Sequence, residues 1–348
     1  MGIPQVNLGG KSVGHIGYGL LGLSFDPKLS QEACFQAMKT AADAGATAWS
    51  TATYYGRPDP HHNLKLIAAF FEKYPEYGNL ITLVVKGGLQ QMRPVSDINI
   101  IREELLQVKA IFGAKPIDVY GFARLPKEIT LAETFTMLGT LQGEGLFNHI
   151  GVSEMKAESL ARALKVCRLL RIPTHATQIC NIAVVEIEVS LWSFDQEIQA
   201  VVEWSKANSV PIFCYSPLGR GLLTGQYRKE SDLGGMQAMH PRFQGDAFLQ
   251  NIKLVESLEG IAERKGIKIT QLALAWLVHI SPFNIPIPGS AKPDRVEENS
   301  ESANIVLTAE DLVDINQILN EFQPKGGRYP ESHADLLVCL TVLNRTVF

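Results

Sequence analysis

The hydrophobic positions of the chain fall into short runs separated by longer stretches with helical spacing. Each run is apolar or rich in β-branched residues, and the stretch after it repeats its apolar positions every three or four residues. Eight such runs lie at residues 15–19, 46–50, 81–86, 117–122, 148–153, 183–188, 211–215 and 284–288. Eight alternations of strand and helix predict an α/β protein whose parallel strands close into a (β/α)8 TIM barrel.

The ends of several helices are also marked in the sequence. Helical spacing covers residues 30–44, 97–112, 157–170 and 196–208, with Ser30 and Ser96 as candidate N-caps. Thr308-Ala-Glu-Asp resembles a capping box and predicts a last helix that ends near Phe322. The chain after Tyr215, and again from 234 to 247, lacks regular spacing and predicts extra loops over a barrel mouth. We expect residues 1–348 to form a single barrel domain with a C-terminal loop or tail from about residue 324.

Composition narrows the class of protein. Hydrophobic residues make up 46% of the chain, charged residues 20%, and the formal net charge is −4, values ordinary for a packed soluble enzyme. No basic excess suggests a nucleic acid or an acidic membrane as partner. The five cysteines are scattered without metal-ligand spacing, and no apolar run is long enough to span a bilayer. We therefore expect reduced thiols, no metal and a cytoplasmic location. Composition does not fix the oligomeric state.

A glycine motif follows the first predicted strand. Gly17-Tyr-Gly-Leu-Leu-Gly22 matches the G-x-G-x-x-G pattern of dinucleotide-binding Rossmann units. In such units a helix begins at the third glycine, but here helical spacing begins only near Ser30. The pattern favours a flexible loop over the barrel mouth, where glycines permit close backbone approach to a ligand.

Polar residues stand at the predicted strand ends, where a barrel gathers its functional groups. Lys86 ends the third strand and Tyr55 follows the second. Side by side, the lysine would stabilise a tyrosinate and lower the pKa of the phenol, which would make Tyr55 a proton donor for carbonyl reduction. Two alternatives stay open: Lys86 could extend to solvent at the rim, and Tyr55 could be a packed loop aromatic.

A candidate phosphate site lies late in the chain. A Pro-Gly-Ser turn at the end of the last strand is followed by a helix start, whose backbone N–H groups can bind an anion. Lys292 and Arg295 stand close by and can pair with phosphate. A solvated loop with a helix cap explains the same residues.

Several segments, in order, resemble the aldo-keto reductases. They are residues 45–56, 84–87, 117–120, 151–154, 188–191, 215–225 and 287–290 with 298–299. Within that family the chain is most similar to the fungal pyridoxal reductases, through Trp49, residues 71–75, Ala123-Arg124 and residues 186–191. The resemblance implies reduction of a small aldehyde or ketone, pyridoxal-like or a fungal secondary metabolite, by hydride from NADPH.

The resemblance also assigns site residues. Tyr55 and Lys86 match the proton donor and its activating lysine. The remaining matches concern NADPH: the carboxamide (Ser153, Glu154, Glu186), the nicotinamide face (Tyr215), the pyrophosphate (Ser216, Leu218, Arg220), the 2′-phosphate (Ser290, Lys292, Arg295) and the adenine (Glu298, Asn299). The basic pair near the 2′-phosphate favours NADPH over NADH.

Some positions depart from the family pattern. Ser50 stands where an aspartate normally pairs with the lysine, and Ala123 where a histidine normally orients the carbonyl. Serine can hydrogen-bond an ammonium group but cannot neutralise it. Glu154 and Glu186 replace the usual carboxamide side chains.

Three residues are candidates for the histidine's role. His61 and His62 follow the Tyr55 loop, and Arg124 follows Ala123, although neighbours on a strand point in opposite directions. The altered site leaves two further hypotheses beside carbonyl reduction. One is a non-redox or imine-directed enzyme, and the other is an NADPH-sensing binding protein with slow turnover.

Overall fold

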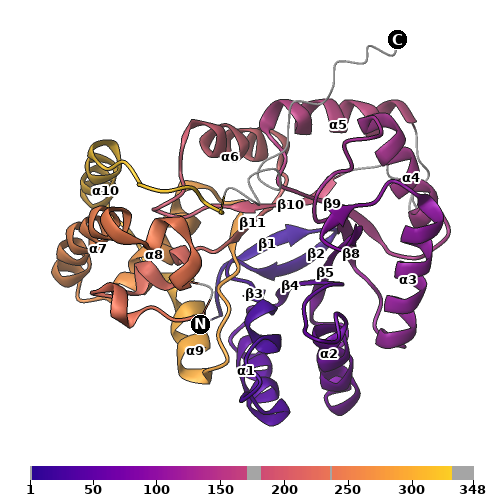
Figure 1. Cartoon of the computed structure of the whole chain (residues 1–348), viewed down its shortest axis with the longest axis horizontal. Coiled ribbons are helices and arrows are strands. Elements are labelled where there is room, and N and C mark those ends of the chain that lie inside the picture. Colours follow the sequence, from indigo (N-terminus) through magenta and orange to yellow (C-terminus); the bar gives the residue numbers. More distant parts are fainter. Residues whose placement is uncertain (1, 171–181, 236, 331–348) are drawn as a thin grey trace.

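Eight parallel strands form the centre of the molecule. The computed structural model describes residues 2–170, 182–235 and 237–330, and Figure 1 shows helices arranged around the strands. Along the sheet the strands are β3 (Tyr18–Gly19), β4 (Ala48–Ala52), β5 (Thr82–Gly87), β8 (Val119–Phe122), β9 (His149–Ser153), β10 (Ile182–Glu188), β11 (Ile212–Tyr215) and β12 (Asn284–Pro286). Each of the eight predicted runs overlaps one of them, so the predicted barrel is confirmed.

The barrel closes between its first and last strands. The backbone N–H of Gly17 donates to the carbonyl of Pro286 at 2.8 Å, and that of Gly19 donates to Pro288 at 3.2 Å. A Cβ on Gly17 would lie 2.5 Å from the Ala48 carbonyl oxygen, and one on Gly19 would lie 2.6 Å from that of Ile287. These two glycines therefore let the first strand fit tightly between its neighbours.

The Rossmann interpretation of this motif is excluded. Gly22 lies in a short 3-10 helix, Leu21–Ser24, and α1 begins only at Gln31. The expectation that the glycines serve a ligand is corrected for Gly17 and Gly19, which face the backbone of neighbouring strands, while a Cβ on Gly22 would meet nothing within 4 Å.

Most predicted helices lie where expected. The helices are α1 (Gln31–Asp43), α2 (His62–Lys73), α3 (Ile98–Phe112), α4 (Leu131–Gly143), α5 (Ala157–Leu170), α6 (Gln196–Asn208), α7 (Gly245–Lys265), α8 (Ile269–Ile280), α9 (Pro293–Glu301) and α10 (Ala309–Glu321). Ser30 caps α1, and Thr308 forms a capping box with Asp311. The cap of α3 is Asp97 instead of the predicted Ser96, because the Asp97 carboxylate accepts from the Asn99 N–H at 2.8 Å.

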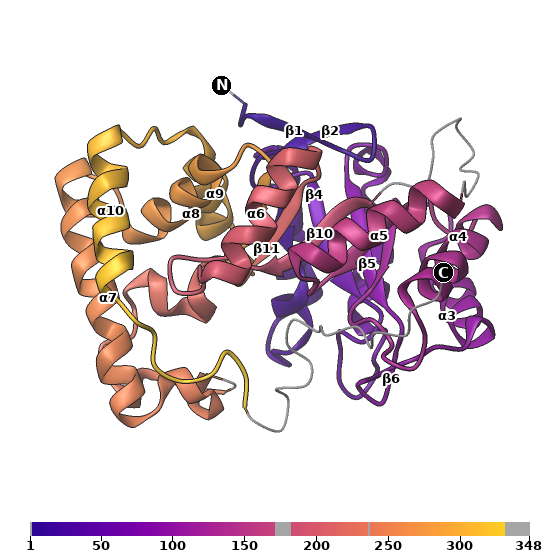
Figure 2. The same cartoon turned by 90° about the horizontal axis from the view of Figure 1, so that it is seen from above.

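An unpredicted hairpin closes one end of the barrel. Strands β1 (Gln5–Leu8) and β2 (Lys11–Gly14) pair antiparallel, and their Val6, Leu8 and Val13 side chains pack against Val84 and Phe213 inside the barrel. Figure 2 shows this hairpin at one end and β6 at the opposite end. Its signal was Gly9-Gly10, both with positive φ, a two-residue hairpin turn between short strands.

Loops gather at the other end, where the strands finish. The predicted insertion after β11 contains short 3-10 helices, among them Gly219–Thr224 and Pro241–Phe243. A small hairpin, β6 (Leu89–Gln90) with β7 (Arg93–Pro94), follows β5. The segment after α10 runs back beside the insertion, where Arg242 donates to the Gly326 carbonyl at 3.2 Å.

Two further expectations from the sequence concern the cysteines and membrane-spanning helices. Cys34, Cys167 and Cys214 are buried, and Cys34 and Cys214 are free thiols, as expected, while Cys180 and Cys339 lie outside the described residues. Over the described ranges, none of the helices combines the length and apolarity that crossing a membrane requires.

Candidate active site

Lys86 lies buried at the end of β5 in a compact set of polar contacts. Its ammonium nitrogen is 2.8 Å from Glu186 Oε1, and it donates to Ser50 Oγ at 2.7 Å and to the Thr51 carbonyl at 3.1 Å. Ser50 in turn donates to Glu186 Oε2 at 2.8 Å. Because Lys86 is only 6% exposed, the alternative of a lysine extending to solvent at the rim is excluded.

Tyr55 lies beside this lysine. The Lys86 ammonium is 5.5 Å from the centroid of the Tyr55 ring. The loop is held in place by two backbone bonds: Thr53 N–H donates to Lys86 at 2.8 Å, and Asn63 N–H donates to Tyr55 at 3.0 Å. The predicted pair is therefore brought together by the ends of β4 and β5.

The pKa of Tyr55 is raised above its ordinary value. Burial is the main cause, the negative charge of Glu186 adds to it, and the positive charge of Arg124 opposes it. The expectation of a lowered pKa is thus corrected, because burial and the charge of Glu186 outweigh the charge of Arg124. Tyr55 holds its proton at neutral pH, the state that a proton donor needs.

Glu186 is the group whose place the sequence did not reveal. Expected beside the carboxamide of a cofactor, its carboxylate instead lies against Lys86 and Ser50. It comes from β10, across the barrel from β5. A signal was present in the sequence: a neutral Ser50 near a buried lysine calls for a carboxylate from another strand end.

Glu154 and Tyr215 form a second buried contact. Glu154 follows β9 with a positive φ of 52°, and its carboxylate accepts from the Tyr215 hydroxyl at 2.8 Å. Arg328, from the segment after α10, lies 3.5 Å from the other oxygen of Glu154. Ser153 is buried directly before Glu154. Of the three side chains expected at the carboxamide, both glutamates are thus engaged within the protein.

The loop after β11 has an unusual backbone. Ser216 and Arg220 both have positive φ, 48° and 55°, and so do Gly219 and Gly221 beside them. Strained backbone of this kind concentrates at functional sites, since it costs stability. The Arg220 guanidinium stacks on the ring of Tyr329 at 4.9 Å, and the Tyr329 hydroxyl is 3.3 Å from that of Tyr215. No sequence pattern pointed to Tyr329 as a residue of the site.

The segment that we expect to bind a phosphate lies between the end of β12 and the start of α9. Ser290 Oγ accepts from the Lys292 N–H at 3.1 Å, and the Ser290 carbonyl accepts from Tyr18 at 2.6 Å. Helix α9 begins at Pro293 with no side-chain cap. Its first N–H groups, together with the exposed Lys292 and Arg295, suit an anion.

The two residues expected at the adenine differ in their surroundings. Glu298 lies in α9 and forms an ion pair with Lys268 of the neighbouring loop. Asn299 is buried, 6% exposed, on the same helix. Leu218, expected at the pyrophosphate, packs partly buried against the core.

Arg124, His61 and His62 are the candidates for orienting the carbonyl, because Ala123 stands where the family normally has a histidine. Ala123 is fully buried, and Arg124 donates to its carbonyl at 2.6 Å. The charge of Arg124 acts on both Tyr54 and Tyr55, so Arg124 does lie at the barrel mouth. His61 and His62 stand at the start of α2, where His62 is exposed. Arg124 is therefore the stronger candidate.

One supporting residue was not predicted. Glu104 of α3 accepts from Thr53 Oγ1 at 3.0 Å, from the Gly88 N–H at 3.0 Å and from the Tyr120 hydroxyl at 2.7 Å. Thr53 precedes Tyr55, and Gly88 closely follows Lys86, so this carboxylate joins the two strand ends that carry the pair.

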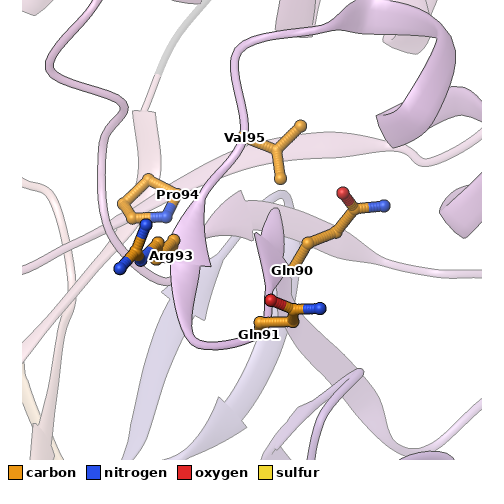
Figure 3. A pocket seen from close by; sticks show the side chains of 5 residues that line it. All are labelled: Gln90, Gln91, Arg93, Pro94 and Val95. Carbon is orange, nitrogen blue, oxygen red and sulfur yellow. The ribbon is translucent and has the colours of Figure 1, made fainter.

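Beyond Gly88, Figure 3 shows the Gln90, Gln91, Arg93, Pro94 and Val95 side chains around an open depression at hairpin β6–β7.

Comparison with known proteins decides the family. The family model described as the aldo/keto reductase family matches residues 15–320, which include all eight barrel strands. The chain belongs to the aldo/keto reductase family. It is accordingly an oxidoreductase, and its family membership supports carbonyl reduction.

Individual aldo/keto reductases agree with this assignment. The chain is 31% identical over 338 residues to a Schizosaccharomyces pombe protein named as a pyridoxal reductase, covering 94% of this chain and 97% of that one. A Saccharomyces cerevisiae protein also named as a pyridoxal reductase is 30% identical, with 90% and 95% covered. Among solved structures, a glycerol dehydrogenase from Gluconobacter oxydans superimposes with a TM-score of 0.77 at 19% identity, with 92% and 96% covered. That likeness concerns the fold alone.

Proposed function

We propose that this protein reduces a small aldehyde or ketone with NADPH and that Tyr55 donates the proton. The observation that carries the proposal is the buried contact of Lys86 with a tyrosine that keeps its proton. As negative charge develops on the carbonyl oxygen, a nearby phenol can supply a proton, and the lysine charge stabilises the tyrosinate that remains.

The residues for NADPH fit the cofactor unevenly. Ser290, Lys292 and Arg295 would hold its 2′-phosphate, and the strained loop from Ser216 to Arg220 its pyrophosphate. Tyr215 would face the nicotinamide and Ser153 its carboxamide, while the adenine would lie by Glu298 and Asn299. When bound, NADPH supplies the hydride. A relative in Schizosaccharomyces pombe, 29% identical, carries NADP+ in its name, which supports this choice of cofactor.

Pyridoxal is the first substrate to test. Two fungal relatives are named as pyridoxal reductases, and the barrel mouth is ringed by aromatic side chains that suit a planar ring, namely Tyr54, Tyr55, Tyr215 and Tyr329. A small fungal metabolite with a carbonyl group is the other class within this proposal.

The test is NADPH oxidation by the purified protein across a panel of aldehydes that includes pyridoxal, with imines alongside. Tyr55→Phe removes only the phenolic hydroxyl, so we expect kcat to fall by about 10²- to 10⁴-fold. Tyr54→Phe is the matched control, because the two tyrosines are adjacent in one loop. Equal losses in both variants would remove Tyr55 from the role of donor. Tight NADPH binding without turnover of any compound would favour the sensing hypothesis.

A further inference from the structure

Glu186 and Lys86 meet across the interior of the barrel. Strands β8 and β9 lie between β5 and β10 in the sheet, so the two side chains reach toward each other over the barrel mouth. Both border the same internal void, together with Val84 and Val184. With a volume of about 10 Å³, this void has room for at most about one water molecule. The contact is therefore direct and nearly dry.

The contact is a closed triangle. Lys86 Nζ lies 2.8 Å from one oxygen of Glu186 and donates to Ser50 Oγ at 2.7 Å, while Ser50 donates to the other glutamate oxygen at 2.8 Å. Both oxygens of the carboxylate are thus used. A buried ammonium group is costly unless a charge of opposite sign and further hydrogen bonds compensate it. Ser50 is neutral, so the compensating charge comes from Glu186.

We propose that Glu186 is a positioning residue of the reaction, which holds the Lys86 ammonium beside the Tyr55 ring and, with Ser50 as bridge, supplies the negative charge of the site. The inference rests on the proposed carbonyl reduction for its catalytic meaning. It assigns Glu186 to the proton-donating side of the site instead of to the cofactor carboxamide.

The charged and titratable groups around Tyr55 determine how its pKa responds when the charge of Glu186 is removed. Lys86 faces it from β5, Glu186 from β10, Arg124 from the end of β8, Tyr329 from the segment after α10, and Tyr54 from its own loop. Glu186 raises the pKa of Tyr55, so removing its charge lowers that pKa. An ionised phenol cannot donate a proton, and the alkaline limb of the rate profile of Glu186→Gln should move to lower pH.

The first experiment needs neither cofactor nor substrate. A double-mutant cycle compares the thermal midpoints of Lys86→Met, Glu186→Gln and the double variant. Each single variant leaves one buried partner unpaired, so we expect the double variant to lose less than the sum of the two. If Glu186→Gln is too unstable to purify while the double variant folds, that result supports the coupling in the same way.

Glu188→Gln is the matched control for the cycle. It makes the same change two residues further along β10, and its buried carboxylate accepts from Ser193 at 2.6 Å instead of facing the lysine. We expect its effect to add to that of Lys86→Met. Additive effects for Glu186 as well would overturn the proposal, whether or not the protein is active.

The second experiment measures catalysis. In Glu186→Gln we expect kcat to fall by about 10- to 100-fold with little change in the KM for the aldehyde, since misplacing a reacting group costs this much. The alkaline limb of its pH profile should move to lower pH. Adding Ser50→Asp to this variant returns a carboxylate next to Lys86 from the β4 side, and we expect the alkaline limb to return toward its original pH.

The two proposals fail in different ways. A wild-type protein that reduces no carbonyl compound contradicts the proposed function, while coupling in the thermal cycle still shows that Glu186 holds Lys86. An active wild type whose rate, pH profile and KM are unchanged in Glu186→Gln contradicts the positioning role alone.

Discussion

Arg124 places a positive charge near Tyr54 and Tyr55 at the barrel mouth. It follows the fully buried Ala123, and its charge lowers the pKa of Tyr55. If it orients the carbonyl, Arg124→Met should lower kcat/KM by about 10- to 100-fold, the equivalent of the roughly 1.5–3 kcal/mol of a hydrogen bond to a charged group. Arg124→Lys should keep part of the activity because it keeps the charge.

The pH profile gives Arg124 a second readout. Removing its positive charge raises the pKa of Tyr55, so the alkaline limb of the rate should move to higher pH, opposite to Glu186→Gln. Unchanged kinetics in Arg124→Met, together with a large loss in His62→Ala, would transfer the orienting role to the histidine.

A contact between two site residues was predictable from the sequence where their strands follow each other along the chain. Lys86 and Tyr55 are adjacent because their strands, β4 and β5, are neighbours in both sequence and sheet. The contact of Ser50 with Glu186 joins residues 136 positions apart, and it depends on which way each side chain leans across the barrel. No periodicity encodes that direction.

The β6–β7 hairpin carries a strained turn between its two strands. Gln91 and Met92 both have positive φ, 48° and 63°, a conformation in which glycine and asparagine are favoured. Met92→Gly should therefore raise the free energy of unfolding by about 0.5–1 kcal/mol, while Met92→Ala keeps the strain and should not. The measurement is the urea midpoint of each variant, and a destabilised glycine variant would contradict the expectation.

The insertion after β11 contacts the segment after α10 through His240. Its ring packs against Phe243 and Tyr329, with centroids 5.8 and 6.2 Å away. Burial, aided by the charge of Arg220, lowers the pKa of His240 from 6.5 to about 4. Between these two values the unfolded chain binds a proton that the folded protein does not, so stability falls as pH drops from about 6.5 toward 4.

His240→Asn checks this sign. A shift of this size is equivalent to about 3 kcal/mol at most. We expect the thermal midpoint of the wild type to fall more between pH 7 and pH 5 than that of the variant. Parallel curves for the two proteins would show that His240 does not titrate in this way.

Elements were predictable where several turns of spacing agree, as in α5 and α6, whose bounds match the sequence. Elements outside the alternation of strand and helix were not. No helix follows either strand of the hairpin β1–β2 before β3, so the hairpin did not stand out as part of that alternation. The cap of α3 depended on a choice between neighbouring Ser96 and Asp97.

At the scale of the whole molecule, the eight alternations sufficed to predict the barrel because few architectures accommodate them. What they did not predict is how its two ends differ. One end is closed by the packed hairpin β1–β2, and the other collects the site, the insertion and the segment after α10.

The seam between Gly17 and Pro286 has a consequence for synthesis on the ribosome. Translation proceeds at about 5–20 residues per second, so the first strand waits on the order of tens of seconds for its last partner to emerge. Until then the nascent sheet has two open edges, which are templates for pairing with other chains. A chaperone that shields those edges would therefore act mainly before residue 288 leaves the exit tunnel.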